Sequence, residues 1–376
     1  MQNVFMTNVH INKVRHLQNI DIFLSDTERK HLILTGKNGS GKTSLLEAIR
    51  DSVLYEQQVI KQDGTRLTRI LGLKKPSIDI SFSQKIPNFS NAIFVYIPAE
   101  RSTFTIPKSI ERMSIDEKTK VNRNASKDFL RHILNLDYQL YGAQTNSDKA
   151  LENNLQEWFN NFQTALRNIY SCQELELRRD AKNLAFRIDM PGREPFALNE
   201  MADGYAAVLK IFMELLLRFE IADAVVDYTL PAIAMIDEIE THLHVELQRR
   251  VLPFLTQMFP NIQFIVATHS PFVMTSLKNA IVYDLEKNER LENPSFYSYD
   301  TVVEAFLDTS MYSGELIRYF ERYKELCFKE RTDEENEEFL RAKAELEVKS
   351  IPSTELYIAF QDIEKRRKAE KNDSSI

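Results

Sequence analysis

Cysteine and long apolar runs are almost missing from this chain of 376 residues. Its two cysteines, Cys172 and Cys327, lie far apart and have no histidine at ligand spacing, which argues against a disulfide framework and a zinc site. We expect both to be buried structural thiols. No stretch reaches about 18 uncharged apolar residues, and the first residues carry no apolar signal core. The sequence therefore predicts a cytoplasmic protein without membrane contact.

Glycine is also scarce, since the chain has 9 where average usage of about 7% would give roughly 26. Three of them, Gly36, Gly39 and Gly41, fall within one short segment, which indicates a special backbone geometry there. The apolar fraction of 43% and the charged fraction of 27% exclude a disordered chain. A net charge of −7 argues against a protein that coats nucleic acid with its whole surface.

The hydrophobic pattern predicts an α/β fold. Alternation of apolar and polar residues from Val4 to Leu24 indicates an antiparallel β part at the N-terminus. Further along, short buried strands alternate with helices, which is typical of a mixed, largely parallel sheet covered on both faces. We expect buried strands at 31–35, 92–97, 232–236 and 263–267, a strand pair around 184–188, and helices starting near 44 and spanning 206–219 and 245–259.

We divide the chain into four parts. We expect residues 1–108 and 181–300 to form the two halves of one α/β domain, 109–180 to form a helical insert, and 301–376 to form a charged helical region. The charge runs of the last part indicate either solvated helix faces or a partner contact. At 1.5 Å rise per residue, the insert is too short for a long antiparallel arm.

A phosphate-binding loop is the strongest motif. The pattern G-x-x-x-x-G-K-[ST] follows a predicted strand and opens a predicted helix. Backbone N–H groups can turn inward around an anion there, Lys42 can reach the β- and γ-phosphates, and the Thr43 hydroxyl can ligate Mg²⁺. We therefore expect ATP and Mg²⁺ as cofactors. The predicted nucleotide-binding residues are Gly36, Lys37, Asn38, Gly39, Ser40, Gly41, Lys42, Thr43 and Ser44.

Two further strands end in polar residues suited to the same chemistry. Asp237 follows the apolar run 232–236 and should emerge beside Thr43 to hold Mg²⁺, and Glu238 is then placed to orient or deprotonate the attacking water. His269 follows the next strand and could donate a hydrogen bond to the γ-phosphate. We expect Lys42, Glu238 and His269 to be catalytic, and Thr43 and Asp237 to be the metal ligands.

Together these motifs resemble the ATP-binding-cassette (ABC) superclass. The similarity extends from Val9 to Leu285 and is greatest to the soluble branch, which includes SMC, Rad50 and RecF-like proteins and the OLD-like ATPases of bacterial anti-phage defence. The resemblance implies an ABC-type P-loop NTPase fold. It also implies a head-to-tail homodimer, or a higher oligomer of dimers, closed by ATP. In such a pair the signature residues Ala202, Asp203 and Gly204 of one protomer would contact the γ-phosphate bound by the other.

The chain departs from the ABC pattern in several places. Met201 and Ala202 replace the common Leu-Ser, so a hydroxyl is missing from the signature. Either Glu100 or Arg101 could stand for the missing glutamine, or their turn could be purely structural. Val245 occupies a position where relatives often have proline.

Resemblance also suggests the biological role. The chain is similar to ATPases of Septu-type and retron-associated modules, which implies regulation of a separately encoded effector nuclease and contact with nucleic acid through that partner. No histidine follows His269, so no nuclease active site is evident in this sequence. The alternative is a RecF/Rad50-like ATPase of DNA repair or structure. A transporter nucleotide-binding subunit is a third reading, which the degraded signature and glutamine loop disfavour.

Overall fold

A computed structural model describes residues 4–61, 77–83, 93–99, 129–180, 185–222, 225–226, 231–307, 314–349 and 355–373. The chain separates into two compact units, residues 1–302 and 303–376. Within the described ranges, no helix is long and apolar enough to cross a membrane. The predicted boundaries at 108, 180 and 300 stay predictions, and residues 109–128 of the expected insert lie outside the described residues.

A six-stranded sheet forms the centre of the first unit, in the order β14-β13-β3-β12-β11-β5. All neighbouring strands are parallel except β13 and β14, so the sheet is mixed and mostly parallel and the predicted α/β class is confirmed. The four predicted buried strands are present, whereas β13 and β14 were not predicted. The bounds are β3 (His31–Thr35), β5 (Ile93–Ile97), β11 (Ala232–Ile236), β12 (Ile262–Ala267), β13 (Ala280–Asp284) and β14 (Glu289–Glu292).

An antiparallel sheet of order β2-β1-β4 is built from β1 (Met6–Val14), β2 (Leu17–Phe23) and β4 (Ile78–Phe82). This confirms the predicted antiparallel β part. The fully buried side chain of Gln263 on β12 ties the two sheets together, since its Nε2 donates to the carbonyls of Met6 and Lys30 and its Oε1 accepts from the Met6 N–H. Such satisfied polar groups fix one relative placement of two layers.

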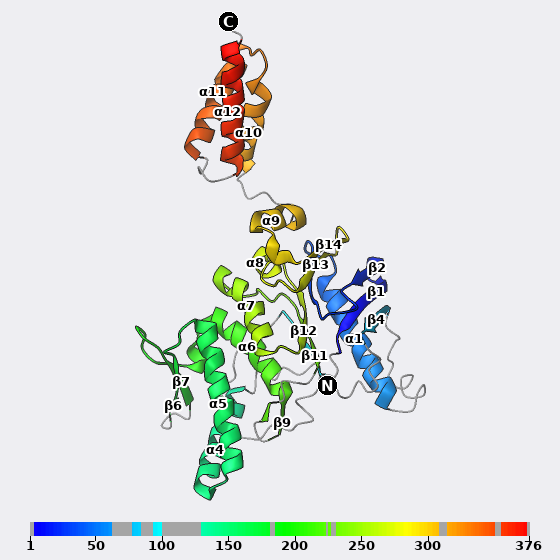
Figure 1. The fold of residues 1–376 in the computed structure, drawn as a ribbon, viewed down its shortest axis with the longest axis vertical. Helices are drawn as coiled ribbons and strands as arrows, with labels where there is room; N and C mark the ends of the chain where they lie inside the picture. Colours follow the sequence, from blue (N-terminus) through cyan, green and yellow to red (C-terminus); the bar gives the residue numbers. More distant parts are fainter. Residues whose placement is uncertain are drawn as a thin grey trace. The chain divides into compact units, whose positions relative to one another are not determined.

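Helices cover both faces of the central sheet (Figure 1). On one side, α1 (Lys42–Lys61) packs with the antiparallel sheet in one apolar core that includes Leu45, Leu46 and Ile49. On the other side lie α6 (Asp203–Phe219), which is apolar along nearly its whole length, and α7 (Val245–Met258). A short helix α8 (Pro271–Met274) follows β12. Parallel strands thus end together at one edge, between covered faces.

The remaining elements of the first unit extend from this core. Helices α4 (Phe129–Asn146) and α5 (Lys149–Tyr170) form a hairpin, and the expected strand pair is part of a three-stranded sheet. Cys172, just after α5, is only half-buried, so the prediction of a buried thiol is wrong there because the residue lies in an exposed turn. The smaller elements are β6 (Glu176–Asp180), β7 (Ala185–Asp189), β8 (Phe196–Ala197), η3 (Leu198–Glu200), β9 (Glu220–Ala222), β10 (Val225–Val226) and η4 (Pro294–Phe296). Helix α9 (Tyr299–Leu307) contains the boundary between the two units.

The second unit is made of the helices α10 (Gly314–Cys327), α11 (Asp333–Lys349) and α12 (Glu355–Asp373). Their shared core includes Tyr323, Phe339 and Phe360, with Cys327 buried beside them as predicted. Glu364, on the inner side of α12, accepts hydrogen bonds from the Tyr323 hydroxyl and from Lys343 and Arg367. The charged C-terminal region is therefore a helical unit with an apolar core of its own.

Acidic pH should destabilise the first unit through His31. This largely buried residue begins β3, and its Nδ1 accepts a hydrogen bond from the Phe264 backbone N–H at 3.1 Å. Burial, together with the charge of Arg29, lowers the His31 pKa from 6.5 to about 4. The unfolded chain therefore takes up this proton at a higher pH than the folded chain. The free energy of unfolding should fall by about 2 to 3 kcal/mol as the pH drops from about 6.5 to 4.

Denaturant titrations at several pH values would measure this loss. The variant His31→Asn keeps a side-chain hydrogen-bond acceptor near the position of Nδ1 but does not titrate. Between pH 6.5 and 4, the free energy of unfolding of this variant should therefore fall by about 2 to 3 kcal/mol less than that of the wild type. Equal pH dependence in the two proteins would show that His31 is not the group responsible.

Candidate functional site

The glycine-rich loop connects the end of β3 to the start of α1. Its three glycines have positive φ values of 128° at Gly36, 86° at Gly39 and 100° at Gly41, which residues with a side chain rarely adopt. Space is also limited: a Cβ on Gly36 would lie 2.8 Å from Ser40 Oγ, and one on Gly41 would lie 2.9 Å from Leu17 Cδ1. Backbone geometry therefore requires glycine at all three positions, as the sequence indicated, and close packing requires it also at Gly36 and Gly41.

Lys42 lies under this loop and is buried. Its Nζ donates hydrogen bonds to the carbonyl oxygens of Gly36 at 2.8 Å and Lys37 at 3.1 Å. Burial lowers the pKa of Lys42, while the carboxylates of Asp237, Glu238, Glu240 and Asp284 act in the opposite direction. The ammonium group is thus held in place by the loop's own carbonyls and by surrounding negative charge.

Asp237 and Thr43 meet at the adjoining strand ends. Asp237 follows β11, is buried, and accepts a hydrogen bond from the Thr43 hydroxyl. Burial raises the pKa of Asp237, whereas the bond from Thr43 lowers it. A carboxylate and a hydroxyl oxygen side by side form a donor set that suits a hard cation such as Mg²⁺. The structure therefore brings together the two residues predicted as metal ligands.

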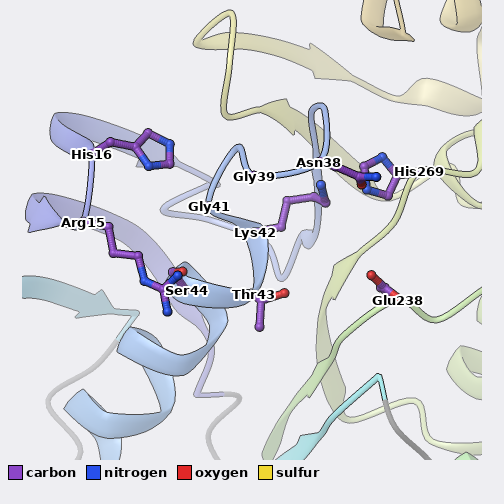
Figure 2. Close-up of a pocket in the computed structure, with 10 residues that line it drawn as sticks. All are labelled: Arg15, His16, Asn38, Gly39, Gly41, Lys42, Thr43, Ser44, Glu238 and His269. Atoms are coloured by element: carbon purple, nitrogen blue, oxygen red, sulfur yellow. The ribbon is translucent and has the colours of Figure 1, made fainter.

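Glu238 and His269 complete the group around one pocket of about 230 Å³. Figure 2 shows that they approach Lys42 and Thr43 from the ends of β11 and β12. Glu238 is exposed and has a positive φ of 42°, and the Thr241 hydroxyl lies 3.4 Å from its Oε2. Burial, followed by the charge of Lys42, lowers the pKa of His269, so its ring is neutral at neutral pH.

Two residues of the pocket, Arg15 and His16, were missed by the sequence analysis. They form the tight turn between β1 and β2 and approach the loop from the side opposite Glu238 and His269 (Figure 2). Arg15 has a positive φ of 53°, and His16 Nε2 donates to the Ser40 carbonyl at 3.1 Å. In the sequence, Arg15 and His16 are simply a cationic and a ring side chain between two predicted strands. This signal becomes informative only once the β1–β2 hairpin is known to lie against the glycine-rich loop.

The signature residues lie elsewhere. Ala202, Asp203 and Gly204 are not among the 10 residues that line the pocket in the described part of the chain. Asp203 opens α6, and Gly204 packs closely against the backbone of the loop after β11, since a Cβ there would lie 3.1 Å from the His242 carbonyl oxygen. Glu100 and Arg101, considered for the missing glutamine, lie outside the described residues.

A glycine-rich loop at the start of a helix, a buried carboxylate at a neighbouring strand end and a mostly parallel sheet define a P-loop nucleotide-binding domain. The sequence profile of the family described as "AAA domain, putative AbiEii toxin, Type IV TA system" matches residues 32–275. The chain belongs to this family.

Several curated proteins are similar to this chain. The Septu protein PtuA of Bacillus mycoides (strain KBAB4) is 25% identical over 77% of this chain and 41% of that protein. The Retron Vc95 probable ATPase of Vibrio cholerae serotype O1 biovar El Tor is 34% identical over 25% of this chain and 20% of that protein. The DNA replication and repair protein RecF of Rickettsia prowazekii (strain Madrid E) is 28% identical over 45% of this chain and 44% of that protein.

These matches confirm the predicted resemblance to Septu and retron-associated ATPases, and this chain spans less than half the length of each relative. Among solved structures, an SMC head bound to the C-winged helix domain of ScpA matches with a TM-score of 0.44 and 13% identity, covering 78% of this chain and 100% of that chain. A nucleotide-free ATP-binding cassette of an ABC transporter matches with a TM-score of 0.39 and 11% identity, covering 82% of this chain and 96% of that chain.

Proposed function

We propose that this chain binds ATP with Mg²⁺, hydrolyses the ATP to ADP and phosphate, and uses the cycle to regulate an effector in anti-phage defence. The observation that supports this most directly is the convergence of residues from three strand ends at one pocket. Lys42, Thr43, Glu238 and His269 line it, and Asp237 lies beside Thr43, whose hydroxyl donates a hydrogen bond to it. A chance match to the loop motif would not bring the other two strand ends to it.

In this proposal the loop residues 36–44 bind the phosphates. The backbone N–H groups and the start of α1 supply partial positive charge, and Lys42 exchanges its bonds to the Gly36 and Lys37 carbonyls for phosphate oxygens. Thr43 and Asp237 would hold Mg²⁺. When bound, that ion neutralises charge on the phosphate oxygens and stabilises the charge that develops during phosphoryl transfer.

Glu238 and His269 have separate roles in this proposal. Glu238 is exposed at the pocket wall, where its carboxylate can accept a proton from a water molecule or orient it. His269 is neutral at neutral pH, so one ring nitrogen can donate a hydrogen bond to a γ-phosphate oxygen. Arg15 and His16 would contact the nucleotide from the opposite side of the loop.

We further propose that two chains pair head to tail around ATP, alone or as part of a higher oligomer. The signature residues Ala202, Asp203 and Gly204 are absent from the lining of the described pocket, which is compatible with a role toward a second protomer's nucleotide. The start of α6 offers free backbone N–H groups to an anion, although Ala202 supplies no hydroxyl.

Relatives support the biological part of the proposal. The similarity to a Septu protein and to a retron probable ATPase supports an ATPase of a defence module. We propose that it is a cytoplasmic subunit whose effector is a separately encoded nuclease, and that nucleic acid is reached through that partner. The match to RecF favours a second candidate, a DNA repair or structural ATPase that contacts DNA itself.

Purification of the tagged chain from its native cells separates the two candidates. We expect Mg²⁺-dependent ATP hydrolysis and a co-purifying nuclease subunit. ATP hydrolysis stimulated by DNA, with no nuclease present, would support the RecF-like function instead. Calorimetry with saturating ATP and Mg²⁺ tests nucleotide binding, which both candidate functions require. A titration with no heat beyond that of dilution would contradict both functions.

A further inference from the structure

The loops after β11 and β12 are joined by the side chain of Glu240. Its Oε1 accepts a hydrogen bond from the backbone N–H of His269 at a donor–acceptor distance of 2.6 Å. Its other oxygen, Oε2, is buried and has no hydrogen-bond partner within the part of the chain that the structure describes. A short hydrogen bond from a backbone N–H fixes where that backbone lies, so the position of His269 depends on this acceptor oxygen.

A second connection joins the same loops through α7. Gln248 Nε2 donates to the Leu243 carbonyl at 2.7 Å, and its Oε1 accepts from the Ser270 hydroxyl at 2.6 Å. Ser270 in turn caps α8, because its Oγ accepts from the Val273 N–H. Two independent contacts therefore fasten the segment after β12 to the segment after β11.

The segment after β11 also touches the signature helix. The His242 carbonyl oxygen lies 3.1 Å from the place where a Cβ on Gly204 would be, and His242 has a positive φ of 69°. The segment that carries Glu240 therefore lies beside the start of α6 and leaves no room for a side chain at Gly204.

We propose that Glu240 is a positioning residue for ATP hydrolysis, which holds the backbone of His269 at the edge of the nucleotide pocket. This inference rests on the proposed function. Glu240 does not line the described pocket, so it acts through His269 and not on the nucleotide. ATP hydrolysis then depends on whether residue 240 places an acceptor oxygen within hydrogen-bond distance of the His269 N–H. It does not depend on the negative charge of that residue.

Reach and charge can be separated by substitution. Glu240→Gln keeps an acceptor oxygen at the same reach without the charge, whereas Glu240→Asp keeps the charge and withdraws the oxygens by one methylene. We expect kcat for ATP to fall by about 10- to 100-fold in Glu240→Asp and Glu240→Ala, because no acceptor oxygen at residue 240 then reaches the His269 N–H. Glu240→Gln should stay within about threefold of the wild type, and KM for ATP should change by less than about threefold in all three.

Steady-state ATPase assays on the full chain give both constants, and thermal unfolding checks that each variant is folded. Glu246→Ala serves as the matched control, since it removes a carboxylate that is 80% exposed on α7, and its kcat should equal that of the wild type. If Glu240→Ala does not fold, the Gln and Asp variants decide the question.

An active Asp variant with an inactive Gln variant would overturn the inference, because charge and not reach would then matter. Wild-type kcat in all variants would also overturn it, while leaving the proposed function intact. A wild-type chain that neither binds nor hydrolyses ATP would instead contradict the proposed function itself.

Discussion

Glu238→Gln should lower the rate of ATP hydrolysis by at least about 100-fold while ATP still binds, since a positioned general base typically contributes 10²- to 10⁴-fold. The substitution removes the carboxylate that accepts the proton but keeps the shape of the side chain. Lys42 and Thr43, which line the same pocket, and Asp237 beside Thr43 stay unchanged. Single-turnover hydrolysis and equilibrium nucleotide binding would measure the two effects separately.

The same variant should accumulate closed pairs with ATP, because ATP that is not hydrolysed keeps both sites occupied. Size-exclusion chromatography with light scattering would detect a shift to a dimer, or to a multiple of dimers, that depends on ATP and Mg²⁺. Hydrolysis at the wild-type rate would show that another group is the base. Slow hydrolysis without any ATP-dependent pairing would contradict the head-to-tail arrangement and leave the role of Glu238 standing.

Much of this site could be predicted because its signals are local. A short apolar run followed by a polar residue predicts both a buried strand and a polar side chain at its end, as at β11 with Asp237 and at β12 with His269. Since parallel strands end at one edge, three such segments predict one site without any knowledge of strand order. The glycine spacing adds the backbone conformation, which the positive φ values of Gly36 and Gly41 confirm.

Other parts could not be predicted because they depend on contacts between distant segments. Strand β13 pairs with β3 across about 250 positions of sequence. Its run Ala280–Asp284 has the same apolar character as the predicted strands, so the strand itself was a missed local signal, and only its pairing with β3 depends on distant segments. Arg15 reaches the pocket only because β1 and β2 fold over the loop. Glu240 looked like one of many acidic residues until its bond to His269 was known. These contacts are set by strand pairing and register, which cannot be predicted from any single segment of the sequence.

Lys42→Ala should weaken ATP binding by at least about 100-fold, because two or more charge-assisted hydrogen bonds to phosphate oxygens are lost in a partly desolvated place. In the free protein the ammonium group holds the Gly36 and Lys37 carbonyls, so its removal also loosens the loop that presents the backbone N–H groups. Both effects weaken ATP binding. Isothermal calorimetry with ATP and Mg²⁺ would measure the loss.

A matched control separates the site-specific effect of Lys42 from loss of a positive charge. Lys149→Ala removes a lysine on α5 whose side chain is 77% exposed, and it should bind ATP as the wild type does. Lys42→Ala and Lys149→Ala carry the same net charge, so any long-range electrostatic effect on a polyanionic nucleotide is similar in both. If Lys42→Ala binds ATP as tightly as Lys149→Ala, the phosphates do not occupy the loop at the start of α1, and Glu238 and His269 lose their proposed roles with it.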